Sequence, residues 1–107
     1  MRPPIRLADA WVYILRCRDG SLYTGWSTDL QRRLASHRAG AGSRYTASRL
    51  PVELALALPM ADRSAARREE ARIKQLDRPA KLALIAASPE AAPAGPVGPA
   101  GDALGSP

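Results

Sequence analysis

Two runs of β-branched and aromatic residues, 11–15 and 22–26, flank an Asp-Gly pair near the start of the chain. Strand-forming runs on either side of Asp-Gly are the strongest short-range signal for a β-hairpin. With a two-residue loop at 19–20, Tyr13 and Tyr23 would point to opposite faces, because a one-residue change of register reverses the faces of a strand.

We predict instead a three-residue loop, 18–20, because its third position requires a positive φ and Gly20 tolerates one. In that register Tyr13 lies opposite Gly25, and Tyr13 and Tyr23 share a face. The two tyrosines are therefore either candidate site residues or simply the edges of a core, since aromatic residues favour strands in any case.

Residues 28–39 predict the first helix. Thr28 is the expected N-cap, with Gln31 three residues later completing a capping box, and Gly40 is the expected stop.

One stripe of this helix mixes apolar and basic residues at helical spacing: Leu30, Arg33, Leu34 and His37. Burying an arginine and a histidine against a sheet is costly unless an anionic group meets them. In the alternative, both side chains sit at the margin of the stripe and reach solvent along their stems.

Residues 40–49 predict a flexible basic loop, and a connection of this length is longer than most. Arg44 and Arg49 are candidates to bind phosphates, and Tyr45 is a candidate to stack on a base.

The alternation of apolar residues that follows this loop predicts a strand over 52–58, closed by Pro59. One strongly apolar face is made of Val52, Leu54, Leu56 and Leu58.

A second helix is predicted over 62–76, with Asp62 or Ser64 as its cap and Ala66, Ile73 and Leu76 on its inner face. Glu69 and Glu70 both lie next to that face. The simplest account of Glu70 is an exposed ion pair with Lys74, four residues on, which contributes only a few tenths of a kcal/mol.

A third helix is predicted over 77–87. Asp77 is its cap, Pro79 lies in the first turn where a missing N–H is harmless, and Leu82 and Ile85 are expected to pack it.

Composition sets the outer bounds. The 107 residues suit one domain, which we expect over 10–87, with a lead-in over 1–9. Fourteen of the twenty residues in 88–107 are Pro, Gly or Ala, so this segment is expected to be a disordered tail. Neither a long apolar run nor a secretory pattern is present, which predicts no membrane partner and a cytoplasmic location. Cys17, the single cysteine, excludes an intramolecular disulfide and is expected to be a small strand-end residue.

Charge narrows the class of partner. The net charge is +6, and residues 1–87 hold all 16 basic residues, fourteen of them arginine, but only eight of the ten acidic ones. Arginine's planar fork suits phosphate oxygens, so this balance favours a polyanion partner. A compositional bias toward alanine and arginine would produce the same count without any function.

The order of these elements resembles that of the GIY-YIG nuclease domain, more narrowly its small single-domain bacterial branch. The resemblance covers about residues 10–87. It is carried by Trp11-Val12-Tyr13, Tyr23-Thr24-Gly25, 29–34 with His37, the glycine-rich loop 40–46, 51–54, and Arg68-Glu69-Glu70 leading to 73–76.

The resemblance implies an α+β fold, with a small three-stranded antiparallel sheet flanked by helices in the order β-β-α-β-α-α. It implies that Tyr13 and Tyr23 are the paired tyrosines of an active site, one of them helping to activate the attacking water. Gly25 would allow close approach of the backbone and the first helix.

The same resemblance implies roles for three charged or polar residues. Arg33 would contact the scissile phosphate, and His37 would be an accessory polar group one turn on. Glu70 would hold one divalent metal, Mg²⁺ or Mn²⁺, with Glu69 as the weaker candidate.

The expected function is that of a metal-dependent endonuclease hydrolysing phosphodiester bonds of DNA, in DNA repair or processing. A short chain with no second DNA-binding module is expected to be structure- rather than sequence-selective. RNA is not excluded as a substrate, and the oligomeric state is open. The alternatives are a noncatalytic nucleic-acid-binding module on the same scaffold, and an adaptor whose tail recruits a protein partner.

Overall fold

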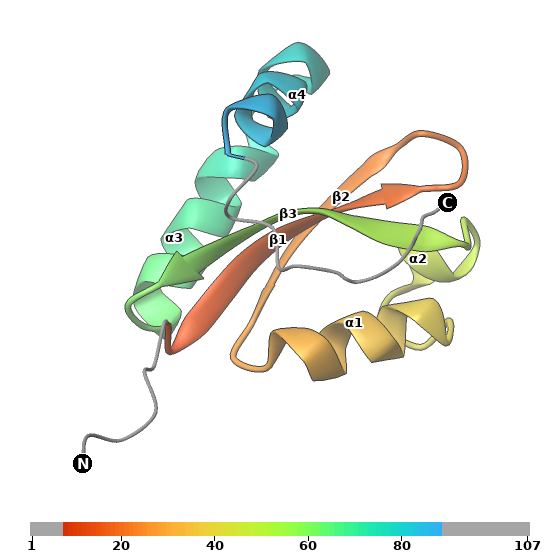
Figure 1. Cartoon of the computed structure of the whole chain (residues 1–107), viewed down its shortest axis with the longest axis horizontal. Helices are drawn as coiled ribbons and strands as arrows, with labels where there is room; N and C mark the ends of the chain where they lie inside the picture. Colours follow the sequence, from red (N-terminus) through yellow and green to blue (C-terminus); the bar gives the residue numbers. More distant parts are fainter. Residues whose placement is uncertain (1–7, 89–107) are drawn as a thin grey trace.

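The computed structural model describes residues 8–88 (Figure 1). Its three strands are β1 (Ala10–Cys17), β2 (Leu22–Ser27) and β3 (Val52–Met60). Its four helices are α1 (Leu30–Arg38), α2 (Arg44–Ala47), α3 (Arg63–Lys74) and α4 (Arg78–Ala87). The predicted α+β fold and order of elements are confirmed, with α2 as an addition. Most of the predicted lead-in and all but the first residue of the predicted tail lie outside the described residues.

The strands form one antiparallel sheet in the order β2-β1-β3. In the β1–β2 hairpin Tyr13 pairs with Gly25, and the Cys17 amide donates to the Ser21 carbonyl at 2.9 Å. Gly20 has φ +85°, and the Asp19 carboxylate accepts hydrogen bonds from Ser21. The predicted three-residue loop and its register are therefore confirmed.

Strand β3 does not present one apolar face. Its pairing with β1 shifts by one residue between Ile14 and Leu15, so that Leu56 pairs with Ile14 but Leu54 pairs with Leu15. The extra residue, Ala55, forms a bulge, so that the side chains before it and after it alternate on opposite faces of the sheet. The prediction of a single apolar face was wrong because a bulge depends on the partner strand and leaves no signal in the alternation itself.

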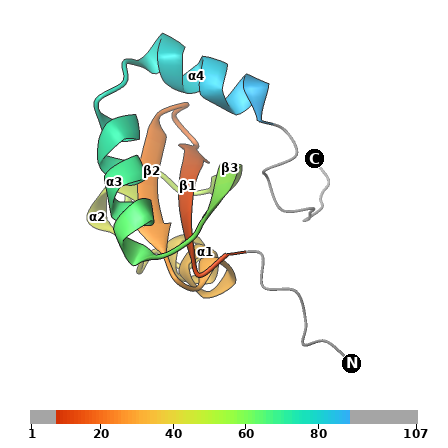
Figure 2. The same ribbon diagram turned by 90° about the vertical axis from the view of Figure 1, so that its left-hand side faces the viewer.

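The sheet therefore has two different cores. The first, on the side covered by α1, contains Tyr13, Leu15, Cys17, Leu30, Leu34, Val52 and Ala57. The second, on the side covered by α3, contains Ala10, Val12, Ile14, Leu56, Ala66 and Ile73. In Figure 2, α3 runs beside the sheet and α4 crosses over its hairpin end.

Side-chain caps begin all four helices. Asp29, not the predicted Thr28, caps α1, because its carboxylate accepts from the Arg32 amide while Ser27 Oγ holds its own backbone amide. Gly40, with φ +82°, follows the end of α1 as expected. Asp62, one of the two predicted candidates, caps α3, and Asp77 caps α4 as predicted.

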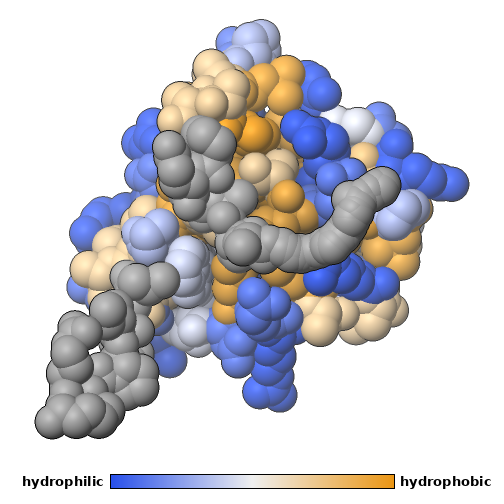
Figure 3. All heavy atoms as spheres, viewed as in Figure 1, coloured by the Kyte–Doolittle hydropathy of each residue, from blue (hydrophilic) through white to orange (hydrophobic). Residues whose placement is uncertain are grey.

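Helix α4 is only loosely buried. Leu84 and Ile85 pack against the second core, whereas Leu82 is 37% exposed, so the prediction that Leu82 packs the helix was wrong. Figure 3 shows hydrophobic residues gathered where α4 approaches the sheet. Within residues 8–88, every helix is too short or too polar to span a bilayer.

Candidate functional site

The two strand tyrosines point to the α1 side of the sheet. Tyr13 is fully buried in the first core and Tyr23 is half-buried beside it. The His37 ring lies between them, with its centroid 5.7 Å from that of Tyr13 and 5.3 Å from that of Tyr23, edge-on to both. The hairpin register and one turn of α1 thus bring three rings into one cluster.

Gly25 makes room for one of these rings. A Cβ at this position would lie 2.6 Å from the Tyr13 hydroxyl oxygen and 2.7 Å from the ring carbon that bears it. Any other residue would displace the Tyr13 ring. The close approach that the sequence predicted is therefore to Tyr13, the cross-strand partner, and not to the first helix.

His37 is buried and is hydrogen-bonded through both ring nitrogens. Nε2 lies 2.9 Å from the Tyr13 hydroxyl, and Nδ1 lies 2.8 Å from Thr46 Oγ1. Burial and the charge of Arg33 lower the pKa of His37, which keeps the ring neutral at neutral pH. Neither reading of the basic stripe is complete, because His37 is buried against polar partners whereas Arg33 remains exposed.

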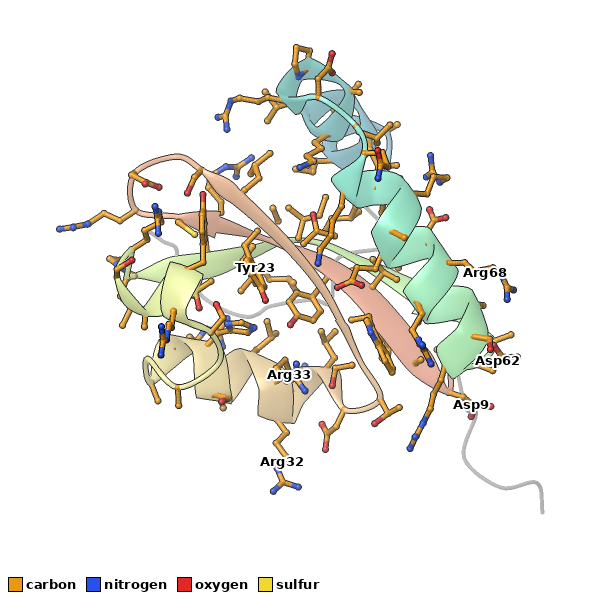
Figure 4. All side chains as sticks on the ribbon, turned by 180° about the vertical axis from the view of Figure 1, so that it is seen from behind. Asp9, Tyr23, Arg32, Arg33, Asp62 and Arg68 are labelled. Carbon is orange, nitrogen blue, oxygen red and sulfur yellow. The ribbon has the colours of Figure 1, made fainter. Side chains whose placement is uncertain are left out.

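Arg33 projects from α1 toward the tyrosine cluster. Figure 4 shows Arg33 on the side of the helix that faces Tyr23, and Arg32 pointing away from the sheet. Burial raises the pKa of Tyr13 to about 12, while the Arg33 guanidinium lowers it as a hydrogen-bond donor and as a charge. An exposed guanidinium next to a buried phenol is a suitable place for an anionic substrate group.

The two adjacent acids of α3 have different surroundings. Glu69 accepts two hydrogen bonds from Arg72, at 3.0 and 2.7 Å, which lower its pKa. Glu70 lies 3.3 Å from Lys74 Nζ, and its side chain is 21% exposed. Its charge also acts on Tyr13 and raises the pKa of that hydroxyl. Of the two acids, Glu70 is therefore the one coupled to the cluster.

The donor set fits a divalent ion held by few protein atoms. Among residues 8–88 no group of three or more His, Cys, Asp and Glu side chains could enclose a metal. Mg²⁺ is commonly bound through one or two carboxylates, with waters and substrate phosphates as its remaining ligands. Glu70, which is partly exposed and whose charge acts on Tyr13, suits that pattern.

The segment predicted as a flexible loop contains a helical turn. Ser43 caps α2 by accepting from the Thr46 amide at 3.1 Å. The turn buries Thr46 completely, and Gly42 is required because a Cβ there would overlap the His37 ring. The sequence reasoning missed Thr46 and Gly42, for which the only signal was the Gly-Ser-x-x-Thr spacing before a short polar turn.

The three predicted nucleic-acid contacts of this segment differ in their surroundings. Arg44 is exposed. Tyr45, 38% exposed, stacks on Tyr23 at 5.9 Å between centroids, and the Arg49 guanidinium lies 3.8 Å above its ring. Arg49 also pairs with Asp19 of the hairpin loop at 3.1 Å. Tyr45 and Arg49 thus extend the aromatic cluster toward the hairpin turn.

Comparison with known proteins agrees with this geometry. The model of the GIY-YIG catalytic domain matches residues 9–83. The chain belongs to the GIY-YIG family. The resemblance noted from the triplets is confirmed, and at the level of the family it associates the chain with nuclease activity and nucleic-acid binding.

Members of this family with similar sequences share the name UPF0213 protein, which states no activity. One from Streptococcus agalactiae serotype V is 47% identical over 76 residues, which is 71% of this chain and 86% of that protein. One from Halobacterium salinarum is 51% identical over 74 residues, which is 69% of this chain and 96% of that protein. The solution NMR structure of a UPF0213 protein from Bacillus halodurans is 39% identical, with a TM-score of 0.51 over 74% of this chain and 84% of that one.

Proposed function

We propose that this chain is a metal-dependent endonuclease that hydrolyses phosphodiester bonds of DNA. The observation that supports this most is the convergence on one hydroxyl. Arg33 from α1, Glu70 from α3 and the neighbouring Tyr23 all act on buried Tyr13, although they are far apart in the sequence. A cation, a phenol and a carboxylate that interact electrostatically are groups that phosphodiester hydrolysis can use.

The proposed hydrolysis depends on proton transfer from the attacking water to Tyr13 and His37. The oxygen of an attacking water bonds to phosphorus while its proton passes to the Tyr13 oxygen. Tyr13 passes its own proton to His37 Nε2, 2.9 Å away. The bond from phosphorus to the departing sugar oxygen breaks, and that oxygen takes a proton from solvent. Because His37 is buried, its proton then returns to the Tyr13 oxygen, and Tyr13 passes a proton back to water in the site.

The charged side chains act on the phosphate. Arg33 stabilises the charge on its non-bridging oxygens, as an exposed guanidinium at this position is suited to do. Glu70 would hold Mg²⁺ or Mn²⁺, which supplies Lewis-acid stabilisation of the leaving oxygen when bound. Tyr23 lines the same side and stacks on Tyr45, leaving the proton relay to Tyr13.

The proposed substrate is DNA with an altered structure, such as a branch, nick or damaged site, in repair or processing. The basic surface supports binding to phosphates without base readout. Exposed Arg44, together with Tyr45 and Arg49, is proposed to contact the strand beside the cleavage site. RNA is the competing substrate in the same assay.

The test compares two adjacent acids of α3 that have different ion-pair partners. Supercoiled plasmid and flap oligonucleotides are incubated with Mg²⁺ or Mn²⁺, and cleavage by Glu70→Gln is compared with that by Glu69→Gln. The proposal expects Glu70→Gln to lose about a hundredfold or more in rate, and Glu69→Gln to keep the wild-type rate, because Glu69 is engaged by Arg72.

A second matched pair uses α1. Arg33→Ala is expected to lose about a hundredfold, whereas Arg32→Ala, which points away from the sheet, should change the rate only slightly (Figure 4). Chelation of divalent ions should abolish cleavage and leave the melting temperature unchanged. Equal cleavage by wild type and all four variants would mean a contaminating nuclease and would refute the assignment.

The Glu70–Lys74 pair supports one alternative, a noncatalytic nucleic-acid-binding module. In that case Glu70 is only a helix ion pair. Salt-dependent DNA affinity that Glu70→Gln leaves unchanged, with no product at any metal concentration, would favour this function over the endonuclease.

A further inference from the structure

Behind His37 lies a short polar chain that the mechanism above does not use. Thr46 is fully buried, and its Oγ1 lies 2.8 Å from His37 Nδ1 and 2.9 Å from Ser43 Oγ. The same hydroxyl lies 3.4 Å from the Ser43 carbonyl oxygen. Thr46 therefore links α2 to the tyrosine cluster through its hydrogen bond to His37.

Two residues near Thr46 in the sequence keep it in contact with His37. Gly42 leaves space for the imidazole, since a Cβ there would overlap it. Ser43 caps α2 and so holds Thr46 at a defined height over His37. Among residues 8–88, neither Gly42 nor Ser43 forms a hydrogen bond to Tyr13. Their effect on Tyr13 therefore passes through His37.

The donors and acceptors decide which nitrogen of His37 carries the proton. Arg33 can only donate, so it cannot accept the Tyr13 hydroxyl proton. Tyr13 is fully buried, and His37 Nε2, 2.9 Å from its hydroxyl oxygen, is the neighbouring group that can accept the hydroxyl proton when this nitrogen is unprotonated. Were Nε2 protonated, the Tyr13 oxygen would face two donors and its own proton would lose this acceptor, which is costly for a buried group.

The hydrogen bonds of His37 Nδ1 are consistent with an unprotonated Nε2. With the imidazole proton on Nδ1, Thr46 Oγ1 accepts it and donates its single hydrogen to Ser43, which offers a hydroxyl and a carbonyl oxygen. Every donor from Tyr13 to Thr46 then has an acceptor. The opposite direction leaves the Tyr13 proton without one.

We propose that Thr46 is a positioning residue that holds His37 as the Nδ1–H tautomer, so that Nε2 is free to accept the proton of Tyr13. The tautomer is a property of the folded chain and stands independently of cleavage. The consequence for the rate rests on the proposed endonuclease function.

The experiment reads the tautomer directly. His37 is the only histidine of the chain, so the imidazole nitrogens of the full-length protein give unambiguous signals in long-range ¹H–¹⁵N NMR spectra. At neutral pH the wild type is expected to show a protonated Nδ1 and an unprotonated Nε2. A wild-type spectrum with Nε2 protonated would overturn the proposal without any variant.

Two substitutions at Thr46 distinguish the effect of its hydroxyl group from that of its side-chain volume. Thr46→Val removes the acceptor at nearly constant volume and should give a mixture of tautomers or the Nε2–H form, whereas Thr46→Ser should keep the wild-type form. Thr46→Val with an unchanged tautomer would overturn the role of Thr46. If Thr46→Val does not fold, Ser43→Ala is the second variant: it removes the α2 cap and one of the two acceptors of the Thr46 hydroxyl, and is expected to broaden the Nδ1 signal. An Nδ1 signal identical to that of the wild type would overturn the role of Thr46.

Kinetics then test the catalytic consequence. Thr46→Val should lower kcat by about tenfold to a hundredfold with little change in KM, and Thr46→Ser should restore it, as for other residues that orient a histidine through its second nitrogen. An Nδ1–H tautomer in a wild type that never cleaves DNA would refute the function and leave the tautomer assignment standing. Full cleavage by a Thr46→Val variant with an altered tautomer would refute the catalytic role.

Discussion

The two faces of the small sheet differ in kind. On the α3 face, Ala10, Val12, Ile14, Leu56, Ala66 and Ile73 form a core of aliphatic side chains. On the α1 face, the buried set includes Tyr13, and His37 and Thr46 join it through hydrogen bonds. Buried polar groups destabilise a fold unless each has a partner, so an aliphatic core is the simpler solution where only stability matters. We therefore expect the α3 face to contribute mainly stability, whereas the proposed function depends on the α1 face, with Glu70 of α3 acting on Tyr13 through its charge. Adjacent residues of β1 can test this difference.

The largest expected effect is that of Tyr13→Phe. Removing the hydroxyl removes the link to His37 and should lower the cleavage rate by about a thousandfold, the size of effect expected for a group that transfers a proton. The free energy of unfolding should fall by only about 1 kcal/mol, because one hydrogen bond is lost. Rates and urea unfolding curves measure both quantities. Wild-type cleavage by the variant would place the chemistry elsewhere.

Ile14→Ala, at the next position of the same strand, should do the opposite. Ile14 is fully buried on the α3 face, and its truncation should lower the free energy of unfolding by about 3 kcal/mol through lost contacts and a cavity. The rate per folded molecule should stay at the wild-type value. A folded Ile14→Ala protein that had lost activity would show that the two faces are not separable.

A pair of glycines sharpens the comparison further. Gly25→Ala pushes a methyl group into the Tyr13 hydroxyl and should lower both stability, by about 2 kcal/mol, and the cleavage rate. Gly20→Ala meets nothing within 4 Å but has to adopt φ +85°, so it should cost about 1 kcal/mol of stability and leave the rate unchanged. Comparison of the two at equal folded fraction isolates the movement of the Tyr13 ring. Equal rates for the two variants would contradict the role of Gly25.

The smallest expected effect is a pH dependence from the polar face. The pKa of His37 is lowered in the folded protein by burial and by Arg33, so the unfolded chain binds the proton more tightly. The free energy of unfolding should therefore fall as the pH drops below 6.5, the ordinary pKa of the side chain. His37→Gln should remove this part of the pH dependence while other groups still titrate. Parallel curves for both proteins between pH 7 and pH 5 would show that His37 contributes nothing.

Local patterns in the sequence were sufficient to predict the hairpin, three of the four helices and the family. The Asp-Gly turn and the left-handed Gly20 determined the hairpin register, and with it the shared face of Tyr13 and Tyr23. The starts of the three predicted helices were placed to within one residue, because capping depends on side chains at most three positions from the end that they cap. Family membership followed from motifs on those same local elements.

Other features depended on partners distant in the chain. The bulge opposite Ile14 and Leu15, which divides β3 between two cores, arises only when β3 pairs with β1. Whether Arg33 or His37 of one helical stripe would be buried was decided by Tyr13 and Thr46, 24 and 9 residues away from His37.

The sequence by itself determined which local elements form and which side chains each of them presents, because backbone preferences, caps and turns act over a few residues. Only the tertiary structure divided β3 between two cores and turned an apparently flexible loop into the turn that packs against His37. Those outcomes depend on which surfaces meet, and a buried polar group selects its partner from whatever the packed fold brings within about 3 Å of it.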